Sequence, residues 1–342
     1  MSTNIKNNKF DQKYEIRLAM YHEIPEIMQF IDQYWKKGHI LARDRQFFEY
    51  EMVTNHAVNF LIAKSKETGA IEGIHGFLPC SENKSKFDIF GALWKTTPEA
   101  MPMLGTELKK RLNSVVGSRA DFGVGVNHTT AIPLLSRFFH YYTAKMKHYY
   151  RLADRDNYLI AKVEQKVIPL YRTNESIVIT ELSDLKQLKG FFDFSADVSS
   201  VPYKDEWYYG KRFFDHPVYK YQIWGITDNK NKAIMVTRAQ KHNNRSIIKI
   251  VDYLGEQKLF AGCGAFFDSL LKDSEYVDFY FDGFEEEYVK QAGMVSIEDY
   301  PNIIPNYFYP FEQSNIDIYV ASSNNTEKCL FFLADADQDR PN

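Results

Sequence analysis

The chain has 342 residues, a formal net charge of −3 and 44% hydrophobic residues. That length suits about two domains with sizeable cores, which excludes a mainly disordered chain. The near-neutral charge, without any block of basic residues, argues against a nucleic-acid-binding surface.

The first predicted elements are a strand and a helix, and the same pattern returns later in the chain. Residues 16–32 read IRLAMYHEIPEIMQFID, and residues 177–193 read IVITELSDLKQLKGFFD. The two segments align without a gap. In both, alternating apolar residues predict a strand, and apolar residues three and four apart after an acidic start predict a helix. We therefore predict that the chain is a tandem repeat.

A meander of strands and a helical crossover follow in the first half. The predicted order is strand 59–64, strand 71–78, strand 87–95, helix 104–116, strand 121–126 and helix 130–140. Three antiparallel strands followed by a helical crossover predict a mixed sheet. This order argues against a dinucleotide-binding fold, although GVGVNH at residues 123–128 has two of the glycines of that motif.

The second half repeats these elements in the same order. The matching positions are Phe60 with Tyr221, Ile62 with Ile223, Ile71 with Ile234, Asp121 with Asp278 and Tyr149 with Tyr307. The periodicity breaks at VIPLYRTNES, residues 167–176, where we place the boundary. We predict an α/β protein with two similar domains, 1–168 and 169–342. Each domain is expected to have a mixed, mostly antiparallel sheet flanked by helices.

Several short motifs give the chain a resemblance to a known family. They are LWK at 93–95, LGTEL at 104–108, IVDYLG at 250–255, IPNYFYPF at 304–311 and DADQDRPN at 335–342. With the element order, they resemble tandem GNAT-type acyltransferases from bacterial surface-polysaccharide (O-antigen or capsule) gene clusters. The resemblance implies transfer of an acyl group from acetyl-CoA or another acyl-CoA to the amino group of a nucleotide-linked amino sugar.

The donor site that the resemblance implies lies at the turn before the helix at 104–116. It would include Trp94, Met103, Leu104, Gly105 and Thr106, because a CoA pyrophosphate needs the free N–H groups of a helix N-terminus. The family's loop reads Q/RxxGxG/A, whereas here the basic residue and the first glycine are absent. The second half offers FAGCGAFFDSLL at 260–271, also without a basic residue. Either half could hold the donor, and we favour the first.

The catalytic groups are expected on the central strands. His75 lies in the middle of a predicted strand and is a candidate general base, although a lone histidine on an apolar face is more often a core residue. Asn127 and His128 close the strand at 121–126, where the family often has an asparagine that contacts pantetheine. Leu135 stands at the position where the family has a tyrosine that acts as the general acid for the leaving thiolate.

The acceptor site is expected to use charged residues of the second half. Arg238 is the repeat counterpart of His75 and could hold a phosphate, and Asp252 lies in the IVDYLG motif. Asp335, Asp337 and Asp339 would share one face of an extended strand, with Arg340 beside them. These carboxylates could receive an ammonium group, or the segment could be a solvated tail. An EF-hand is rejected because Arg340 replaces its glycine.

The remaining expectations concern compartment, metal and alternative functions. Cys80, Cys263 and Cys329 lie far apart, so we expect reduced thiols and no metal site. The polar N-terminus and the lack of a long apolar run predict a cytoplasmic protein without a membrane span. Two alternatives stay open: a Fem-type aminoacyl transferase that uses charged tRNA, and a catalytically inert GNAT-like binding protein. The sequence predicts no oligomeric state.

Overall fold

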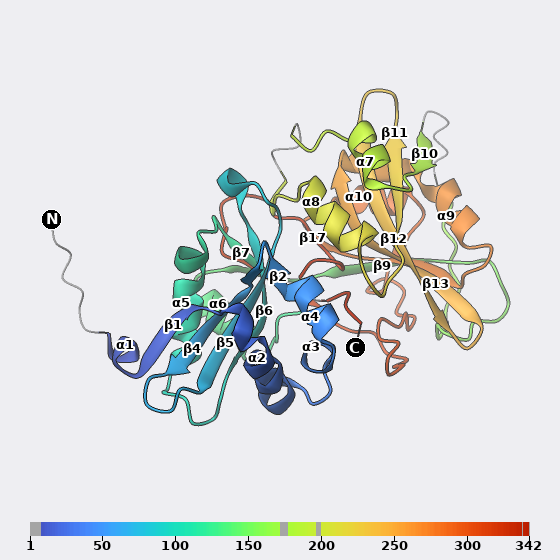
Figure 1. Cartoon of the computed structure of the whole chain (residues 1–342). Helices are drawn as coiled ribbons and strands as arrows, with labels where there is room; N and C mark the ends of the chain where they lie inside the picture. The colour runs from blue at the N-terminus through green and yellow to red at the C-terminus, as the bar shows by residue number, and fades with distance from the viewer. Residues whose placement is uncertain (1–7, 172–176, 196–199, 337, 342) are drawn as a thin grey trace. The chain divides into compact units, whose positions relative to one another are not determined.

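The structure is a computed structural model, and it describes residues 8–171, 177–195, 200–336 and 338–341 (Figure 1). The chain divides into two compact units. Unit 1 comprises Met1–Gly123 with Pro341–Asn342, and unit 2 comprises Val124–Arg340. None of the helices in the described ranges is long and apolar enough to cross a membrane.

Unit 1 contains the predicted meander and crossover. Its helices and strands, in chain order, are α1 (Lys9–Lys13), β1 (Tyr14–Leu18), α2 (Ile24–Phe30), α3 (Ile40–Arg43), α4 (Arg45–Met52), β2 (Val53–Thr54), β3 (Ala57–Val58), β4 (Phe60–Ser65), β5 (Ile71–Pro79), β6 (Ile89–Thr96), α5 (Leu104–Val116) and β7 (Asp121–Val124). Strands β1, β4, β5 and β6 pair antiparallel in that order, and β7 runs parallel to β6.

Helices cover both faces of the unit 1 sheet (Figure 1). Alternate residues of a strand point to opposite faces, so Ile62 packs with α2 to α4 while Leu61 packs with α5. Helix α5 presents Leu104, Leu108 and Leu112, spaced one turn apart, to the sheet. It ends at Gly117, whose φ of 77° is the left-handed conformation that glycine adopts without strain. This packing fixes the N-terminus of α5 beside β6.

Unit 2 contains a second sheet of the same kind. Its helices and strands are α6 (Ala131–Phe138), β8 (Tyr142–Lys145), β9 (Lys147–Leu152), β10 (Val178–Glu181), α7 (Leu185–Phe191), α8 (Glu206–Tyr209), β11 (Gln222–Thr227), β12 (Lys232–His242), β13 (Arg245–Gly255), α9 (Gly264–Leu270), β14 (Tyr276–Asp282), α10 (Glu286–Gln291), β15 (Val295–Ser296), β16 (Tyr319–Ser322) and β17 (Phe331–Phe332). The strand order is β10-β11-β12-β13-β14-β9-β15, and β17 also pairs with β14. Among the strands of this sheet that the structure describes, β13 and β14 are the only parallel neighbours.

The two faces of the unit 2 sheet are covered differently. Helices α9 and α10 contribute Phe267 and Val289 to a core with Ile250 and Phe279 of the sheet. On the other face, irregular segments that include Ile160, Ile304 and Phe308 pack against Ile247, Tyr150 and Tyr276. Buried charged side chains lie on this second face, and they are described with the site below.

The predicted fold class is confirmed. Both halves open with strand and helix, β1 with α2 and β10 with α7, and both contain a meander followed by a helical crossover to a parallel strand. Helix α5 has the predicted bounds. One strand has a different partner: β9 carries Tyr149 of the first repeat, yet it pairs antiparallel with β14 of the second sheet. A buried, Tyr-rich strand pattern predicts a strand but does not identify its neighbour.

Candidate functional site: an unpaired strand edge in unit 1

The central feature of unit 1 is a stretch of β6 without a neighbour on one side. Strands β6 and β7 pair only at Ile89 with Asp121 and at Phe90 with Phe122. Among the residues that the structure describes, no strand pairs with residues 91–96 on the side of β7. We call residues 91–96 of β6 the first edge. Its free backbone N–H and C=O groups can bond to an extended ligand.

A β-bulge distorts the first edge at Leu93. The register with β5 shifts between His75 and Gly76, so that Trp94 and Ala92 are paired and Leu93 is extra. Leu93 has a φ of 46°, which an L-residue adopts only when its surroundings require it. The bulge turns the strand and re-aims the following side chain, Trp94.

Trp94 connects the first edge to the N-terminus of α5. Its Nε1–H donates to the carbonyl oxygen of Gly105 at 2.9 Å. The residue before the helix, Met103, has a φ of 71° and a side chain that is 54% exposed. The backbone N–H groups of Gly105 and Thr106 have no acceptor among the described residues. A helix N-terminus with free N–H groups attracts an anion.

Gly105 is half-buried and faces side chains of β6, and the neighbouring Thr106 is buried. A β-carbon built on Gly105 would lie 3.3 Å from Trp94 Nε1 and 3.6 Å from Thr96 Cγ2, with no backbone atom among its nearest neighbours. All five residues predicted to bind the donor, from Trp94 to Thr106, therefore lie together at the first edge and the N-terminus of α5. Their role as donor ligands stays a prediction.

His75 lies beneath this region, in the layer between β5 and α5. It is 3% exposed, its ring stacks on Trp94 with centroids 5.4 Å apart, and its Nδ1 has no hydrogen-bond partner among the described residues. Burial, reinforced by the charge of Lys109, lowers the pKa of His75 to about 3. A histidine with this pKa is neutral at pH 7 and is a weak base. The predicted general-base role therefore has no electrostatic support here.

Asn127 and His128 lie on the surface at the start of α6. The Asn127 side-chain oxygen accepts hydrogen bonds from the backbone N–H groups of Thr129 and Thr130, both at 3.0 Å. His128 stacks on Tyr319 with centroids 5.3 Å apart. Asn127 thus closes the turn that leads into α6, and its predicted contact with pantetheine stays a prediction.

The predicted acceptor residues Asp252 and Asp335 are joined by a lysine that the sequence reasoning missed. Lys204 Nζ lies 2.9 and 3.0 Å from the two carboxylate oxygens of Asp252, and 2.6 Å from Asp335 Oδ1. All three side chains are buried. We call these residues the lysine cluster. Its two carboxylates share one ammonium group, and burial together with Asp335 raises the pKa of Asp252 to about 6.

Arg238 is also engaged within unit 2. Its guanidinium forms two bonds to Asp339, at 3.1 and 2.5 Å, and a third to Gln240 at 2.7 Å. The guanidinium also lies over the ring of Tyr219, 4.1 Å from the centroid. Arg340 is half-buried, and Asp337 lies outside the described residues. Asp335 and Asp339 are therefore buried and paired, so a solvated terminal tail is the poorer description of this segment.

A second buried polar group was also missed by the sequence reasoning. His148 Nε2 lies 3.2 Å from Asp278 Oδ2, and Lys249 lies 3.6 Å from the same oxygen and donates to Asn306 at 2.6 Å. Burial lowers the pKa of both His148 and Lys249. The sequence did contain a signal for this group, because Lys249 and Asp278 lie inside the apolar strands IIKIVDYL and YVDFYFD.

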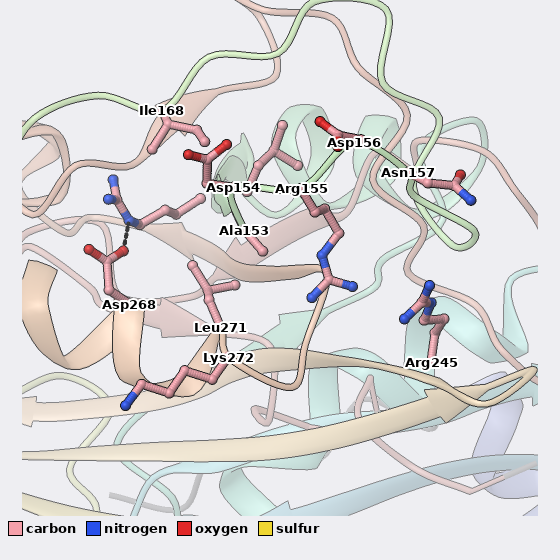
Figure 2. Close-up of a pocket in the computed structure, with 12 residues that line it drawn as sticks. Ala153, Asp154, Arg155, Asp156, Asn157, Ile168, Arg245, Asp268, Leu271 and Lys272 are labelled. Carbon is pink, nitrogen blue, oxygen red and sulfur yellow. Dashed lines mark hydrogen bonds and ion pairs between the residues drawn. The ribbon is translucent and has the colours of Figure 1, made fainter.

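A cavity of about 700 Å³ lies in unit 2 at the amino end of β13 (Figure 2). Its charged lining includes Arg151, Arg155 and Arg245, with Asp268 bonded to Arg151 at 2.8 Å. The parallel strands β13 and β14 separate at their carboxyl ends. The cavity lies at the opposite end of β13, so it is not where a ligand would insert between the separated strands. Within the described residues, no group of three His, Cys, Asp or Glu side chains is arranged to hold a metal ion.

Comparisons with known proteins support the fold. No protein-family model and no curated protein match the chain. Among solved structures, a GCN5-related N-acetyltransferase from Anabaena variabilis ATCC 29413 has a TM-score of 0.56 at 10% identity, covering 91% of this chain and 73% of its own. A probable N-acyltransferase from Enterococcus faecalis V583 has a TM-score of 0.55 at 10% identity, covering 90% and 71%. The chain has the fold of these acyltransferases, in two units.

Proposed function

We propose that the protein transfers an acyl group from acyl-CoA to an amino group, and that the donor binds at the first edge. The observation that carries this proposal is the combination of an unpaired, bulged strand edge with a helix N-terminus that has free N–H groups, joined by the bond from Trp94 to Gly105. The structural likeness to N-acetyltransferases supports the proposal through the fold.

Each part of an acyl-CoA matches one of these features. The pantetheine arm is extended and carries two amide groups, which can exchange hydrogen bonds with residues 91–96 as an added strand would. The pyrophosphate carries negative charge, which the N–H groups of Gly105 and Thr106 would stabilise. The exposed Met103 would lie against the donor at the entrance. These roles follow from the chemistry of the groups on the chain.

The proposed reaction forms one bond and breaks another. The lone pair of a neutral amine attacks the thioester carbonyl carbon, the C–N bond forms and the C–S bond breaks. The amine nitrogen loses a proton and the departing sulfur gains one, so no oxidant or metal is required. With a pKa near 3, His75 would not take the first proton efficiently at neutral pH. We propose that solvent water carries this proton from the amine nitrogen to the departing sulfur.

For the acceptor we propose an amino sugar linked to a nucleotide, as in surface-polysaccharide synthesis. This choice rests on the resemblance of LGTEL, IVDYLG and IPNYFYPF. The charged residues first expected to bind it, Arg238, Asp252 and Asp335, are occupied by buried partners in unit 2. An acceptor that bound them would have to displace those partners.

The proposal is tested by following free thiol during incubation of the purified chain with acetyl-CoA and a panel of amino sugars. We expect acceptor-dependent thiol release and an equal amount of N-acetylated product. Thiol release without acylated product would indicate hydrolysis. Neither product with any acceptor or acyl chain length, from a chain that also fails to bind CoA, would favour the inert GNAT-like alternative.

A further inference from the structure

Unit 2 contains a counterpart of the first edge. Strands β13 and β14 are parallel, and their pairing ends at Ile250 with Phe279. The register between β12 and β13 shifts between Val236 and Thr237, which leaves Val251 as an extra residue. Val251 therefore stands where Leu93 stands in unit 1. We call residues 251–255 of β13 the second edge.

The second edge is covered by the chain itself. Strand β17 pairs antiparallel with β14, Phe332 opposite Phe281 and Phe331 opposite Asp282. Just after it, the N–H of Ala334 donates to the carbonyl oxygen of Val251 at 2.8 Å. The segment thus bonds to both strands that separate, as the amides of an extended ligand would.

The covering segment is packed as a core element. Phe331, Phe332, Leu333 and Ala334 are all buried, and Phe332 stacks on Phe279 with centroids 5.8 Å apart. The approach of the segment is close enough that a β-carbon on Gly283 would overlap the carbonyl oxygen of Cys329. The segment therefore occupies the pairing positions of β14 at Phe281 and Asp282 that an extended ligand would use.

The lysine cluster anchors the segment to the second edge. Asp335 follows the covering residues, and its carboxylate accepts the N–H of Phe332 at 2.9 Å while it pairs with Lys204. Lys204 in turn pairs with Asp252, which lies on the second edge next to Val251. Removing a buried charge from such a group leaves its partner uncompensated, so the anchor is costly to open.

The helix N-terminus of unit 2 is covered as well. Helix α9 begins at Gly264, the counterpart of the turn at Gly105. A β-carbon on Gly264 would overlap the ring of Tyr171, whereas one on Gly105 would meet only the edge of Trp94 and a methyl group. The Tyr171 ring is held over the guanidinium of Arg151, 5.1 Å from its centroid. Residues of the chain itself thus cover both the second edge and the N-terminus of α9, which are the counterparts in unit 2 of the proposed donor site.

We propose that residues 331–335 act as a built-in occupant of the second edge, so that each chain binds one acyl-CoA and binds it in unit 1. The inference rests on the proposed function and assigns its donor to one of two related edges. The inference also gives residues 331–335 a role. Their intramolecular bonds take the place of the acyl-CoA that the second edge could otherwise bind.

The test combines titration calorimetry with hydrogen exchange on the full chain. Titration with acetyl-CoA is expected to give one site per chain, and Gly105→Glu is expected to weaken that site by about 100-fold or more. Ser114→Glu, which adds the same charge to an exposed position of α5, is the matched control. The backbone amides of Phe332 and Ala334 are expected to exchange slowly, with rates that change by less than about twofold when acetyl-CoA saturates the chain.

Three results would contradict this account in different ways. Two sites per chain, or one site that survives Gly105→Glu, would overturn the inference while leaving acyl-CoA binding intact. Faster exchange at Phe332 and Ala334 on addition of acetyl-CoA would show that the donor displaces β17, and would overturn it too. If wild type binds no acetyl-CoA while the amides of Phe332 and Ala334 still exchange slowly, the proposed function and the assignment of the donor to unit 1 are wrong. The covering of the second edge by residues 331–335 would still be supported.

Discussion

The first and second edges are built from the same elements but differ in what covers them. Both arise where two parallel strands separate, after Phe90 and after Ile250, and a bulge follows at Leu93 and at Val251. In unit 1 a β-carbon on Gly105 would meet only side-chain atoms of Trp94 and Thr96, while in unit 2 Tyr171 covers Gly264 and β17 covers the strand edge. We propose that the segments that cover the second edge and Gly264, rather than the elements common to both units, decide which unit binds the donor.

The largest expected effect comes from breaking the anchor of the second edge. Lys204→Met leaves two buried carboxylates without their cation, and loss of one partner of a buried ion pair typically costs about 3–5 kcal/mol. We expect a loss of that order in the free energy of unfolding, measured by urea denaturation. Adding Asp335→Asn to Lys204→Met is expected to restore part of it, because one carboxylate is then neutral.

Lys328→Met is the control for the loss of a lysine charge. Lys328 pairs with Glu285 on the surface, where an ion pair contributes about 0–1 kcal/mol. Equal effects of Lys204→Met and Lys328→Met would contradict the view that the lysine cluster anchors the covering segment.

The next effect concerns the helix N-terminus of α5. Gly105→Glu places a carboxylate where the structure leaves N–H groups free, so bulk and like charge both oppose a pyrophosphate. We expect the dissociation constant for acetyl-CoA to rise by about 100-fold, or about 2.7 kcal/mol, with the same melting temperature as Ser114→Glu. Unchanged affinity in a folded Gly105→Glu protein would remove unit 1 as the donor site.

The pH dependence of stability tests whether His75 is a buried neutral residue. Its pKa is about 3 when folded and about 6.5 when unfolded, so the unfolded chain binds the proton first as the pH falls. His75 therefore makes wild type lose stability as the pH falls from about 6.5 toward 3, at up to about 1.4 kcal/mol per pH unit. His75→Gln is expected to remove this slope. Burial also lowers the pKa of His148, and lowers that of His216 to about 3, but both histidines are present in wild type and in the variant, so their contributions cancel in the difference.

Activity separates the two roles of His75 further. If His75 only packs under α5, kcat/KM of His75→Gln should keep the pH profile of wild type. Loss of a titration step from that profile would restore His75 as the general base.

The smallest effect is expected at the link between the first edge and α5. Trp94→Phe keeps an aromatic ring against His75 but removes the donor to the Gly105 carbonyl. A hydrogen bond of this kind contributes about 0.5–1.5 kcal/mol, so the free energy of unfolding should fall by that amount and affinity for acetyl-CoA by at most about 2- to 12-fold. No change in affinity would mean that the turn at Gly105 is held without Trp94.

The elements of the fold could be predicted because each depends on local pattern. The apolar period of residues 104–116 and the glycine after them define α5, and the gap-free opening repeat predicts two similar halves. The partner of β9 could not be predicted, because pairing across the chain depends on which edge is free. For the same reason the pairing of Phe331 and Phe332 with β14 came only from the structure.

The candidate site was predicted in part for a related reason. Trp94 and Gly105 lie close in sequence, in the motifs LWK and LGTEL, so the resemblance could assign both to the turn before one helix. Asp252 was predicted from the IVDYLG motif and Asp335 from its alternation with Asp337 and Asp339, and the structure brings Asp252 and Asp335 together through Lys204. Lys204, which neutralises them, lies in a segment without periodicity, and nothing in its spacing shows that it is buried.

The most direct test of the central claim is a crystal structure of the chain with bound acetyl-CoA. The account predicts one ligand per chain, with its pantetheine arm along residues 91–96 and its pyrophosphate at the N–H groups of Gly105 and Thr106. It also predicts that β17 stays paired with β14. A ligand between β13 and β14, with Phe331 and Phe332 displaced, would contradict it.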